Sequence, residues 1–181
     1  MSKELLPISV DDMTSAAPLA GALLALNNDH VQELSFLTPE RLMHLAAQAF
    51  YARRIGEVDA FLLAFDERAD YDSPNFLFFR DRYPRFVYVD RIVVAANARG
   101  RGLALRLYRD LFAQAARAGH DYIVCEVNSE PPNPASDAFH AALGFSPVGS
   151  AGIHGGSKTV RYLLRRLDDY AAVAGGSAST E

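Results

Sequence analysis

The chain has 181 residues, half of them apolar and 22% charged, so its composition excludes wholesale disorder and predicts a globular protein. A chain of this length can bury enough surface to fold as one domain without disulfides, and we expect no metal site. The net charge of −4 and the scattered arginines argue against nucleic acid as a partner.

The start of the chain and its cysteine content bear on the compartment. The first ten residues hold neither the long apolar core of a signal peptide nor a membrane span, so we expect a cytoplasmic protein without membrane attachment. The single cysteine, Cys125, lies in an apolar run, which favours a buried strand position in a reducing compartment. We expect one domain over residues 1–170, forming a monomer or homodimer, and a flexible tail over residues 171–181.

The N-terminal part predicts one strand followed by two helices. Residues 5–10 are a short apolar run, and the Ala/Leu-rich stretch 15–26 is helix-prone until turn-forming residues interrupt it at 27–30. Thr38 can cap the second helix and Pro39 suits its first turn.

Two strands should follow these helices. Residues 58–65 and 86–94 are rich in β-branched and aromatic side chains, as buried strands are. Residues 73–83, between them, fit either a short helix or a loop.

The second half alternates strands and helices more clearly. Residues 103–118 repeat apolar side chains at helical spacing, and Gly119 can supply the left-handed residue that ends this helix. A strand at 122–127, a helix at 136–143 and a last strand at 159–166 follow. A strand, a helix and a strand in this order predict a right-handed crossover, with parallel pairing of the strands before and after the long helix.

One segment carries a chemical signal: 94–104, VAANARGRGLA, between a predicted strand and the long amphipathic helix. A loop that leads into a helix N-terminus presents unpaired N–H groups and the positive end of the helix dipole, so it can bind phosphate. Gly100 and Gly102 let the backbone approach an anion, and Arg99 and Arg101 add permanent positive charge. The alternative is an ordinary glycine turn with two chance arginines.

Two common phosphate-binding motifs do not fit this segment. The dinucleotide fingerprint G-x-G-x-x-G needs a third glycine where Leu105 stands. A Walker loop needs Gly-Lys followed by Ser or Thr, and the segment has no lysine.

The segment resembles the hallmark of the GNAT superfamily of acetyl-CoA-dependent N-acetyltransferases, which reads Arg/Gln-x-x-Gly-x-Gly/Ala after the fourth strand. Arg99, Gly102 and Ala104 match this hallmark, and the LGF at 143–145 matches the end of the family's following helix. The resemblance covers about residues 86–145 and is compatible with the rest of the chain.

This resemblance implies a mixed α/β (α+β) fold with a mostly antiparallel central sheet, flanked by about four helices. The sheet would be splayed open between its fourth and fifth strands, 86–94 and 122–127, and pantetheine would lie in the opening. The loop would hold the pyrophosphate, and Asn133 would touch the pantetheine arm, although a plain turn residue before Pro134 is the alternative for Asn133. The residues implied to bind acetyl-CoA are Ile92, Val93, Val94, Arg99, Gly100, Arg101, Gly102, Leu103, Ala104 and Asn133.

The implied activity is transfer of an acetyl group from acetyl-CoA to a primary amine of a small molecule, an amino acid or a protein, by direct attack in a ternary complex. A non-catalytic module that binds acyl-CoA as a sensor is the alternative. An alkylamine, with a pKa of about 10.4, is almost wholly protonated at pH 7, so acyl transfer needs a base.

Asp90 is the candidate base, and Glu126 is the runner-up. Asp90 lies inside an apolar strand, where an unpaired carboxylate would be costly, and alternation places the neighbouring Arg91 on the opposite face, where it should not pair with Asp90. Glu126 lies in the strand expected to form the other wall of the opening. The alternative for both is a carboxylate paired for structural reasons.

His140 is the candidate acid for the leaving thiolate. It stands where the family commonly carries a tyrosine, and histidine can donate a proton near neutral pH. A packing histidine is the alternative. For the acceptor, the resemblance points to 27–36 and 152–158, where Asn28, Glu33 and His154 are polar candidates or ordinary loop residues.

Overall fold

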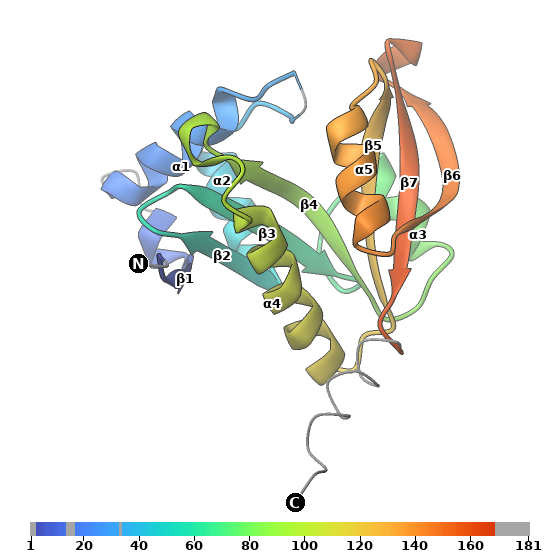
Figure 1. Cartoon of the computed structure of the whole chain (residues 1–181), viewed down its shortest axis with the longest axis horizontal. Coiled ribbons are helices and arrows are strands. Elements are labelled where there is room, and N and C mark those ends of the chain that lie inside the picture. The colour runs from blue at the N-terminus through green and yellow to red at the C-terminus, as the bar shows by residue number, and fades with distance from the viewer. Residues whose placement is uncertain (1–2, 14–16, 33, 169–181) are drawn as a thin grey trace, which may run out of the picture. The chain divides into compact units, whose positions relative to one another are not determined.

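The computed structural model describes residues 3–13, 17–32 and 34–168, and these residues form a seven-stranded mixed sheet with α helices on its faces (Figure 1). The strands are β1 (Leu5–Pro7), β2 (Tyr51–Ile55), β3 (Ala60–Asp66), β4 (Phe86–Val94), β5 (Tyr122–Glu130), β6 (Ser146–Ile153) and β7 (Lys158–Arg166). The helices are α1 (Pro18–Asn28), α2 (Pro39–Gln48), α3 (Pro74–Arg80), α4 (Leu103–Arg117) and α5 (Pro134–Ala142). The strand order is β1-β2-β3-β4-β5-β7-β6.

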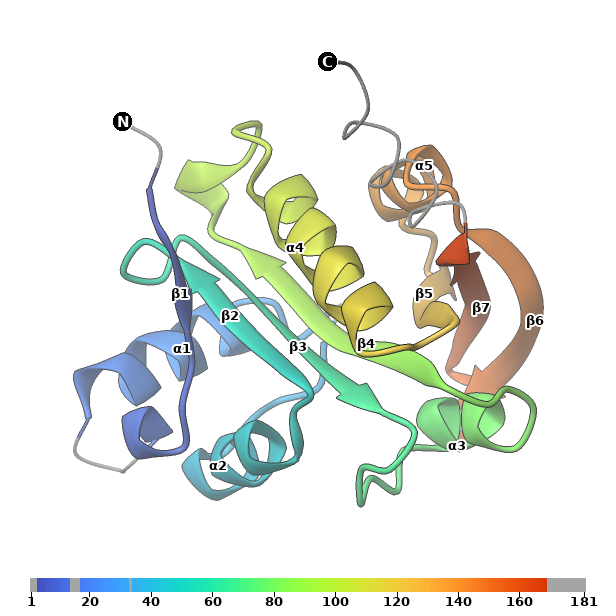
Figure 2. The same cartoon turned by 90° about the horizontal axis from the view of Figure 1, so that it is seen from below.

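Contacts divide the chain into two compact units, the first made of Met1–Asp70 and Val89–Leu111. In this unit β1, β2 and β3 form an antiparallel meander, with α1 and α2 on one face and the first part of α4 on the other (Figure 2). As its sequence predicts, α2 begins after Thr38, whose hydroxyl accepts a hydrogen bond from the Arg41 N–H at 3.2 Å.

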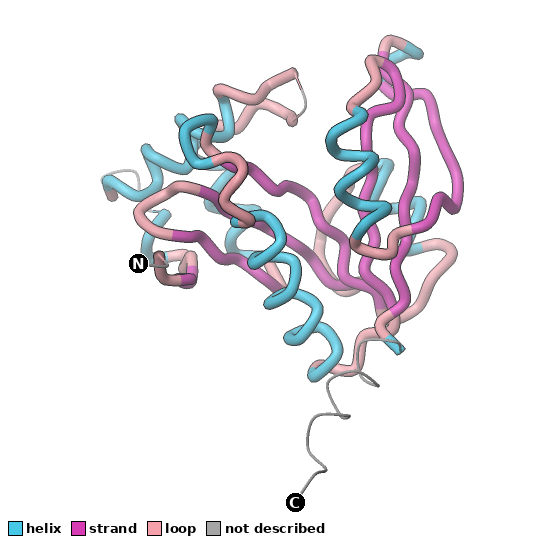
Figure 3. The backbone as a smooth tube through the Cα atoms, in the orientation of Figure 1, coloured by secondary structure: helices cyan, strands magenta, loops and turns pink. Residues whose placement is uncertain are grey.

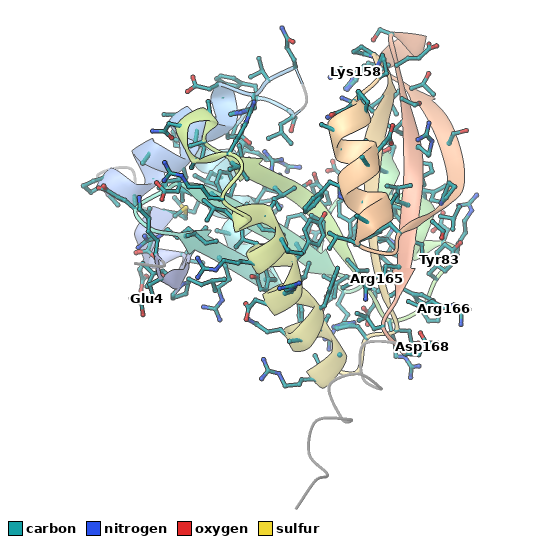
Figure 4. All side chains as sticks on the ribbon, in the orientation of Figure 1. Glu4, Tyr83, Lys158, Arg165, Arg166 and Asp168 are labelled. Carbon is teal, nitrogen blue, oxygen red and sulfur yellow. The ribbon has the colours of Figure 1, made fainter. Side chains whose placement is uncertain are left out.

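The second unit comprises Tyr71–Tyr88 and Phe112–Glu181. It contains the antiparallel strands β5, β7 and β6, drawn in magenta in Figure 3, with α3 on one face and α5 on the other (Figures 1 and 2). Lys158 and Arg166, labelled in Figure 4, are the first and last residues of β7.

The parallel pairing of β4 with β5 is confirmed, and it is short. Both strands have nine residues, yet the register joins only Phe86–Tyr88 to Tyr122–Val124 among the described residues. A ladder of this length is what the predicted opening between the two strands requires.

Two strands and one helix were not predicted. β2 reads YARRI, with two arginines, and β6 contains Pro147 and two glycines, so neither stretch has the composition of a strand. Both form because a neighbouring strand supplies antiparallel pairing, which is continuous along β2 and interrupted in β6 by a bulge between Pro147 and Gly149. The ambiguous stretch 73–83 contains α3, so the described residues form five α helices where about four were expected.

Smaller differences concern the ends of elements. Asn27 and Asn28 form the last turn of α1 instead of interrupting it. The predicted tail, 171–181, lies outside the described residues. None of the helices in the described part of the chain combines the length and apolarity needed to cross a bilayer.

Candidate active site

The loop before α4 has the geometry of an anion site. The Arg106 N–H donates to the Gly102 carbonyl at 3.1 Å, which makes this bond the first of the helix. The N–H groups of the first turn therefore have no acceptor within the helix, and they lie at the positive end of its dipole.

Gly100 and Gly102 keep the approach to these N–H groups open. Their φ angles are +74° and +71°, in the left-handed region that favours glycine. A Cβ built at either position has no heavy atom within 4 Å, so the space in front of the backbone is unfilled. A phosphate fits this cradle, whereas a side chain at either glycine would project into it.

The two arginines of the loop are exposed, and one of them contacts a residue far away in sequence. Arg101 donates to the Asn97 carbonyl at 3.0 Å. Arg99 lies 3.0 Å from Nε2 of His30, whose Nδ1 lies 2.9 Å from the Leu26 carbonyl. Because a carbonyl only accepts, Nδ1 of His30 carries the proton and Nε2 accepts from Arg99. Both guanidinium groups can exchange such exposed contacts for a phosphate.

Apart from Asn133, the remaining predicted cofactor residues lie on the two elements next to this loop, β4 and α4. Val93 is buried, while Ile92 and Val94 are half-buried at the end of β4. Leu103 is buried and Ala104 half-buried in the first turn of α4.

The prediction that Arg91 does not pair with Asp90 is wrong. Nε of Arg91 lies 2.6 Å from Oδ2 of Asp90, and the two side chains are 3% and 4% exposed. The same guanidinium donates to Oδ1 of Asn27 at 2.8 Å and to Oγ of Ser35 at 3.3 Å. Alternation describes where a Cβ points, but the long arginine side chain bends back to the carboxylate because an unpaired buried charge is costly.

Glu126 lies in a different setting, within the second unit. Its Oε1 accepts hydrogen bonds from Nδ2 of Asn75 and from the hydroxyl of Tyr88, both at 3.0 Å. The Tyr162 hydroxyl donates to Oδ1 of Asn75, also at 3.0 Å. We call these four residues, Asn75, Tyr88, Glu126 and Tyr162, the Glu126 cluster.

The Glu126 cluster joins three strands and one helix, and burial separates Glu126 from its partners. Asn75, Tyr88 and Tyr162 are 9%, 1% and 2% exposed, while Glu126 is only partly buried. Glu126 is therefore the least buried residue of the cluster, although its Oε2 is itself buried. Its place opposite Tyr162 follows from the β5–β7 register.

Asn75, Tyr88 and Tyr162 carry no motif that singles them out in the sequence. Strand alternation places Tyr88 on the same side as Asp90, which is the one signal that could have suggested it. Asn75 begins the helix that the sequence left ambiguous, and the register that sets Tyr162 opposite Glu126 is a tertiary feature.

Asn133 and His140 belong to α5. Oδ1 of Asn133 accepts a hydrogen bond from the Ser136 N–H at 3.2 Å, so Asn133 is the N-cap of this helix. Any contact with pantetheine stays a prediction.

His140 is 5% exposed and packs edge-on against Phe145, with ring centroids 5.3 Å apart. Nδ1 lies 2.8 Å from the Ser136 carbonyl, so Nδ1 carries the proton and the neutral ring has an acceptor at Nε2. Burial lowers the pKa of His140 from its ordinary value of 6.5, against the smaller opposing effects of Ser136 and Asp137. These features favour a packing histidine over a proton donor at neutral pH.

Glu126 and His140 lie toward opposite faces of the second unit. Glu126 is bonded to Asn75 of α3, and α3 and α5 cover the two faces of the β5–β7–β6 sheet (Figures 1 and 2). The structure thus does not bring these two candidates together on one face.

Asn28, one of the residues predicted to line the site of the acetyl acceptor, stabilises the segment that follows α1. Its side chain accepts a hydrogen bond from the Leu37 N–H and donates one to the Leu37 carbonyl. His154 is exposed in a short turn after β6, with φ of +52°. Glu33 lies outside the described residues.

Comparison with known proteins agrees with this geometry. Residues 25–145 match the model of the Acetyltransferase (GNAT) family, which is well over half of the chain. The chain belongs to this family. It is therefore an acetyl-CoA-dependent acyltransferase, as the motif at Arg99, Gly102 and Ala104 predicted, and its mixed sheet with the parallel β4–β5 pair is the GNAT fold.

Solved structures share the fold at low sequence identity. The ribosomal-protein-S18-alanine N-acetyltransferase from Escherichia coli is 13% identical, with a TM-score of 0.64 over 91% of this chain and 94% of that chain. The structure called yncA from Salmonella typhimurium, with its cofactor acetyl-CoA, is 16% identical, with a TM-score of 0.67 over 93% and 95%. The NatC complex bound to Gag peptide and CoA contains a chain 15% identical to this one, with a TM-score of 0.70 over 92% and 99%. No curated protein sequence matches the chain.

Proposed function

We propose that this GNAT enzyme acetylates a primary amine by direct attack in a ternary complex, with Glu126 as the base. The observation that carries the proposal is the Glu126 cluster, in which the buried side chains of Asn75 and Tyr88 fix one carboxylate by hydrogen bonds to Oε1. Such a carboxylate would receive a proton from a substrate ammonium group held against it, because its orientation is set.

The proposed reaction balances without any further reactant. Glu126 takes a proton from the bound ammonium, and the neutral amine attacks the thioester carbonyl. The N–C bond forms, the C–S bond breaks, the nitrogen loses its second proton, and the leaving CoA thiolate takes that proton up. Asp90 is the weaker candidate for the base, because Arg91 already neutralises its buried charge.

The loop before α4 is the proposed cofactor site. Backbone N–H groups at 102–104 and the side chains of Arg99 and Arg101 would hold the pyrophosphate in the cradle that Gly100 and Gly102 leave open. Ile92 to Val94 of β4 and Asn133 of α5 would bind the pantetheine arm. When bound, acetyl-CoA supplies the activated acetyl group.

Peptides with a free N-terminus are the first class of acceptor to test. One structural neighbour is named for an alanine of a ribosomal protein, and another is bound to a peptide. The half-buried carboxylate of Glu126 suits an ammonium group of any of the three amine classes.

The test is release of free CoA thiol from acetyl-CoA by the purified protein, measured across a panel of peptides, amino acids and small amines. We expect amine-dependent release and an acetylated product by mass spectrometry. Calorimetric binding of acetyl-CoA without release on any amine would instead support the non-catalytic acyl-CoA sensor.

A further inference from the structure

Asn75 is a buried residue of α3 that links Tyr162 of β7 to the Glu126 carboxylate. Its side-chain amide bridges two groups, the Glu126 Oε1 and the Tyr162 hydroxyl, at 3.0 Å each. An amide oxygen turned toward a carboxylate oxygen would be repelled, so the NH₂ group faces Glu126 and the amide oxygen faces Tyr162. The order of donation is therefore Tyr162 to Asn75 and Asn75 to Glu126.

Aromatic packing holds Asn75 in this position. The next residue, Phe76, meets the ring of Tyr88 with centroids 5.6 Å apart, and Phe79 meets the ring of Tyr162 at 5.4 Å. Both contacts are close to edge-on, the arrangement that aromatic pairs prefer. The helix that carries Asn75 is thus anchored on the rings of the two tyrosines of the Glu126 cluster.

In the described hydrogen bonds, Asn75 of α3 and Tyr88 of β4 donate to Glu126, and Tyr162 of β7 lies opposite it in the strand register. Burial first, and then the negative charge of Glu126, raise the pKa of the Tyr162 phenol, while Arg82 acts in the opposite direction. Tyr162 therefore stays protonated near neutral pH and remains a donor to Asn75.

We propose that Asn75 is a positioning residue of the acetyltransferase. Its side chain accepts a hydrogen bond from Tyr162 and donates one to Glu126. Together with the bond from Tyr88, this bond holds the carboxylate in one orientation and favours its ionised form. This inference rests on the proposed role of Glu126 as the base. Two donors on one carboxylate oxygen stabilise the charged form relative to the protonated one, so the carboxylate is ready to take the substrate proton.

Asn75→Asp replaces the NH₂ group that donates to Glu126 by a carboxylate oxygen. The new side chain has the same shape and can still accept a hydrogen bond from Tyr162. It then sets two carboxylates face to face, and one of them should keep its proton to a pH higher by about two units. Asn75→Leu removes both hydrogen bonds with little change in volume. It should raise the titration midpoint of Glu126 by about one unit and lower kcat about tenfold.

The first readout needs no amine substrate. Carboxyl ¹³C NMR of protein labelled at glutamate and aspartate follows ionisation with pH, and loss of a signal in Glu126→Gln identifies Glu126. The second readout is the acidic limb of kcat/KM for the amine of the panel that is acetylated fastest, which should move upward in parallel. The acetyl-CoA dissociation constant should stay within about twofold, because the Asn75 side chain is bonded to Glu126 and Tyr162 and not to the loop before α4.

Tyr162→Phe and Tyr51→Phe form the matched pair of controls. Both remove a buried phenol hydroxyl, but the Tyr51 hydroxyl donates to the Leu107 carbonyl at 3.2 Å in the first unit. Tyr162→Phe should shift Glu126 in the same direction as Asn75→Leu, by less, and Tyr51→Phe should not shift it. If Asn75→Asp does not fold, Asn75→Leu and Tyr162→Phe carry the test.

An unchanged Glu126 midpoint and an unchanged acidic limb in both Asn75 variants, with only a lower melting temperature, would overturn the positioning role. Failure of the proposed function would look different. In that case the parent would release no CoA, or Glu126→Gln would keep full activity, whatever the NMR titration of the Asn75 variants shows.

Discussion

Asp90 and Glu126 are acidic residues that lie inside apolar strands, one in each compact unit, and their surroundings differ in kind. Asp90 faces a cation, Arg91, and both side chains are almost fully buried. Oε1 of Glu126 accepts hydrogen bonds from two neutral donors, the amide of Asn75 and the phenol of Tyr88. The first arrangement neutralises a buried charge, whereas neutral donors stabilise a carboxylate without cancelling its charge.

The comparison also separates what each carboxylate can do. Arg91 continues from Asp90 to Asn27 and Ser35, so the ion pair braces the segment between α1 and α2. The Glu126 cluster links β4, β5, β7 and α3, and its hydrogen bonds converge on one carboxylate oxygen. We therefore expect loss of Asp90 to act mainly on stability and loss of Glu126 to act mainly on turnover.

The largest effect is expected from Glu126→Gln. The amide keeps the shape but takes up no proton, so kcat should fall by about 10²–10⁴-fold, the usual contribution of a positioned base. Steady-state kinetics with acetyl-CoA and an accepted amine give kcat, and a thermal melt should show little change. A Glu126→Gln enzyme with the parent's rate and pH profile would show that Glu126 is not the base, and Asp90 would then be the candidate to test.

Asp90→Asn tests whether Asp90 acts mainly on stability. It removes the carboxylate charge that pairs with the buried guanidinium of Arg91, which should lower the free energy of unfolding by about 3 kcal/mol. Urea denaturation measures this loss, and kcat of the folded fraction should change far less than in Glu126→Gln. The double replacement Asp90→Asn with Arg91→Met removes both charges and should recover part of the stability. Normal stability with a large loss of kcat would mean that Asp90 is the base.

Gly102→Val tests whether the loop before α4 binds acetyl-CoA. Gly119→Val, at the other end of α4, is its control. Both glycines have positive φ and nothing within 4 Å of a built Cβ, so the backbone strain is similar. Only Gly102 lies at the phosphate cradle, and its replacement should weaken acetyl-CoA binding at least about tenfold, or about 1.4 kcal/mol, by calorimetry. Equal affinities in the two variants would remove the loop from the cofactor site.

The smallest effect concerns His140. Because burial lowers its pKa, the unfolded chain takes up the proton first as the pH falls below 6.5. The contribution to stability is complete above that pH and declines as the pH drops toward the lower pKa of the folded state. His140→Phe has no such titrating group. The free energy of unfolding of the parent should therefore exceed that of the variant by less at about pH 5.5 than at about pH 7.5, as measured by urea denaturation.

Turnover of His140→Phe decides between the two interpretations of this residue. A packing histidine predicts a lowered melting temperature with nearly normal kcat in the folded protein. Normal stability with slow turnover would instead support His140 as the acid that protonates the thiolate.

By itself the sequence determined the features that depend on neighbouring residues. The bounds of β4, the Thr38 cap of α2 and the glycine loop that opens α4 follow from local composition and spacing, and the GNAT motif follows from the same short segment. Local patterns are readable because backbone preferences and helix ends act over a few residues.

The tertiary structure alone decided which side chains meet. β6 forms on the ladder of β7, the Arg91 side chain bends back to Asp90, and Asn75 joins Tyr162 to Glu126 across three elements. Such pairings depend on register and on the cost of burying a charge or a polar group without a partner, and residues far apart in sequence set both.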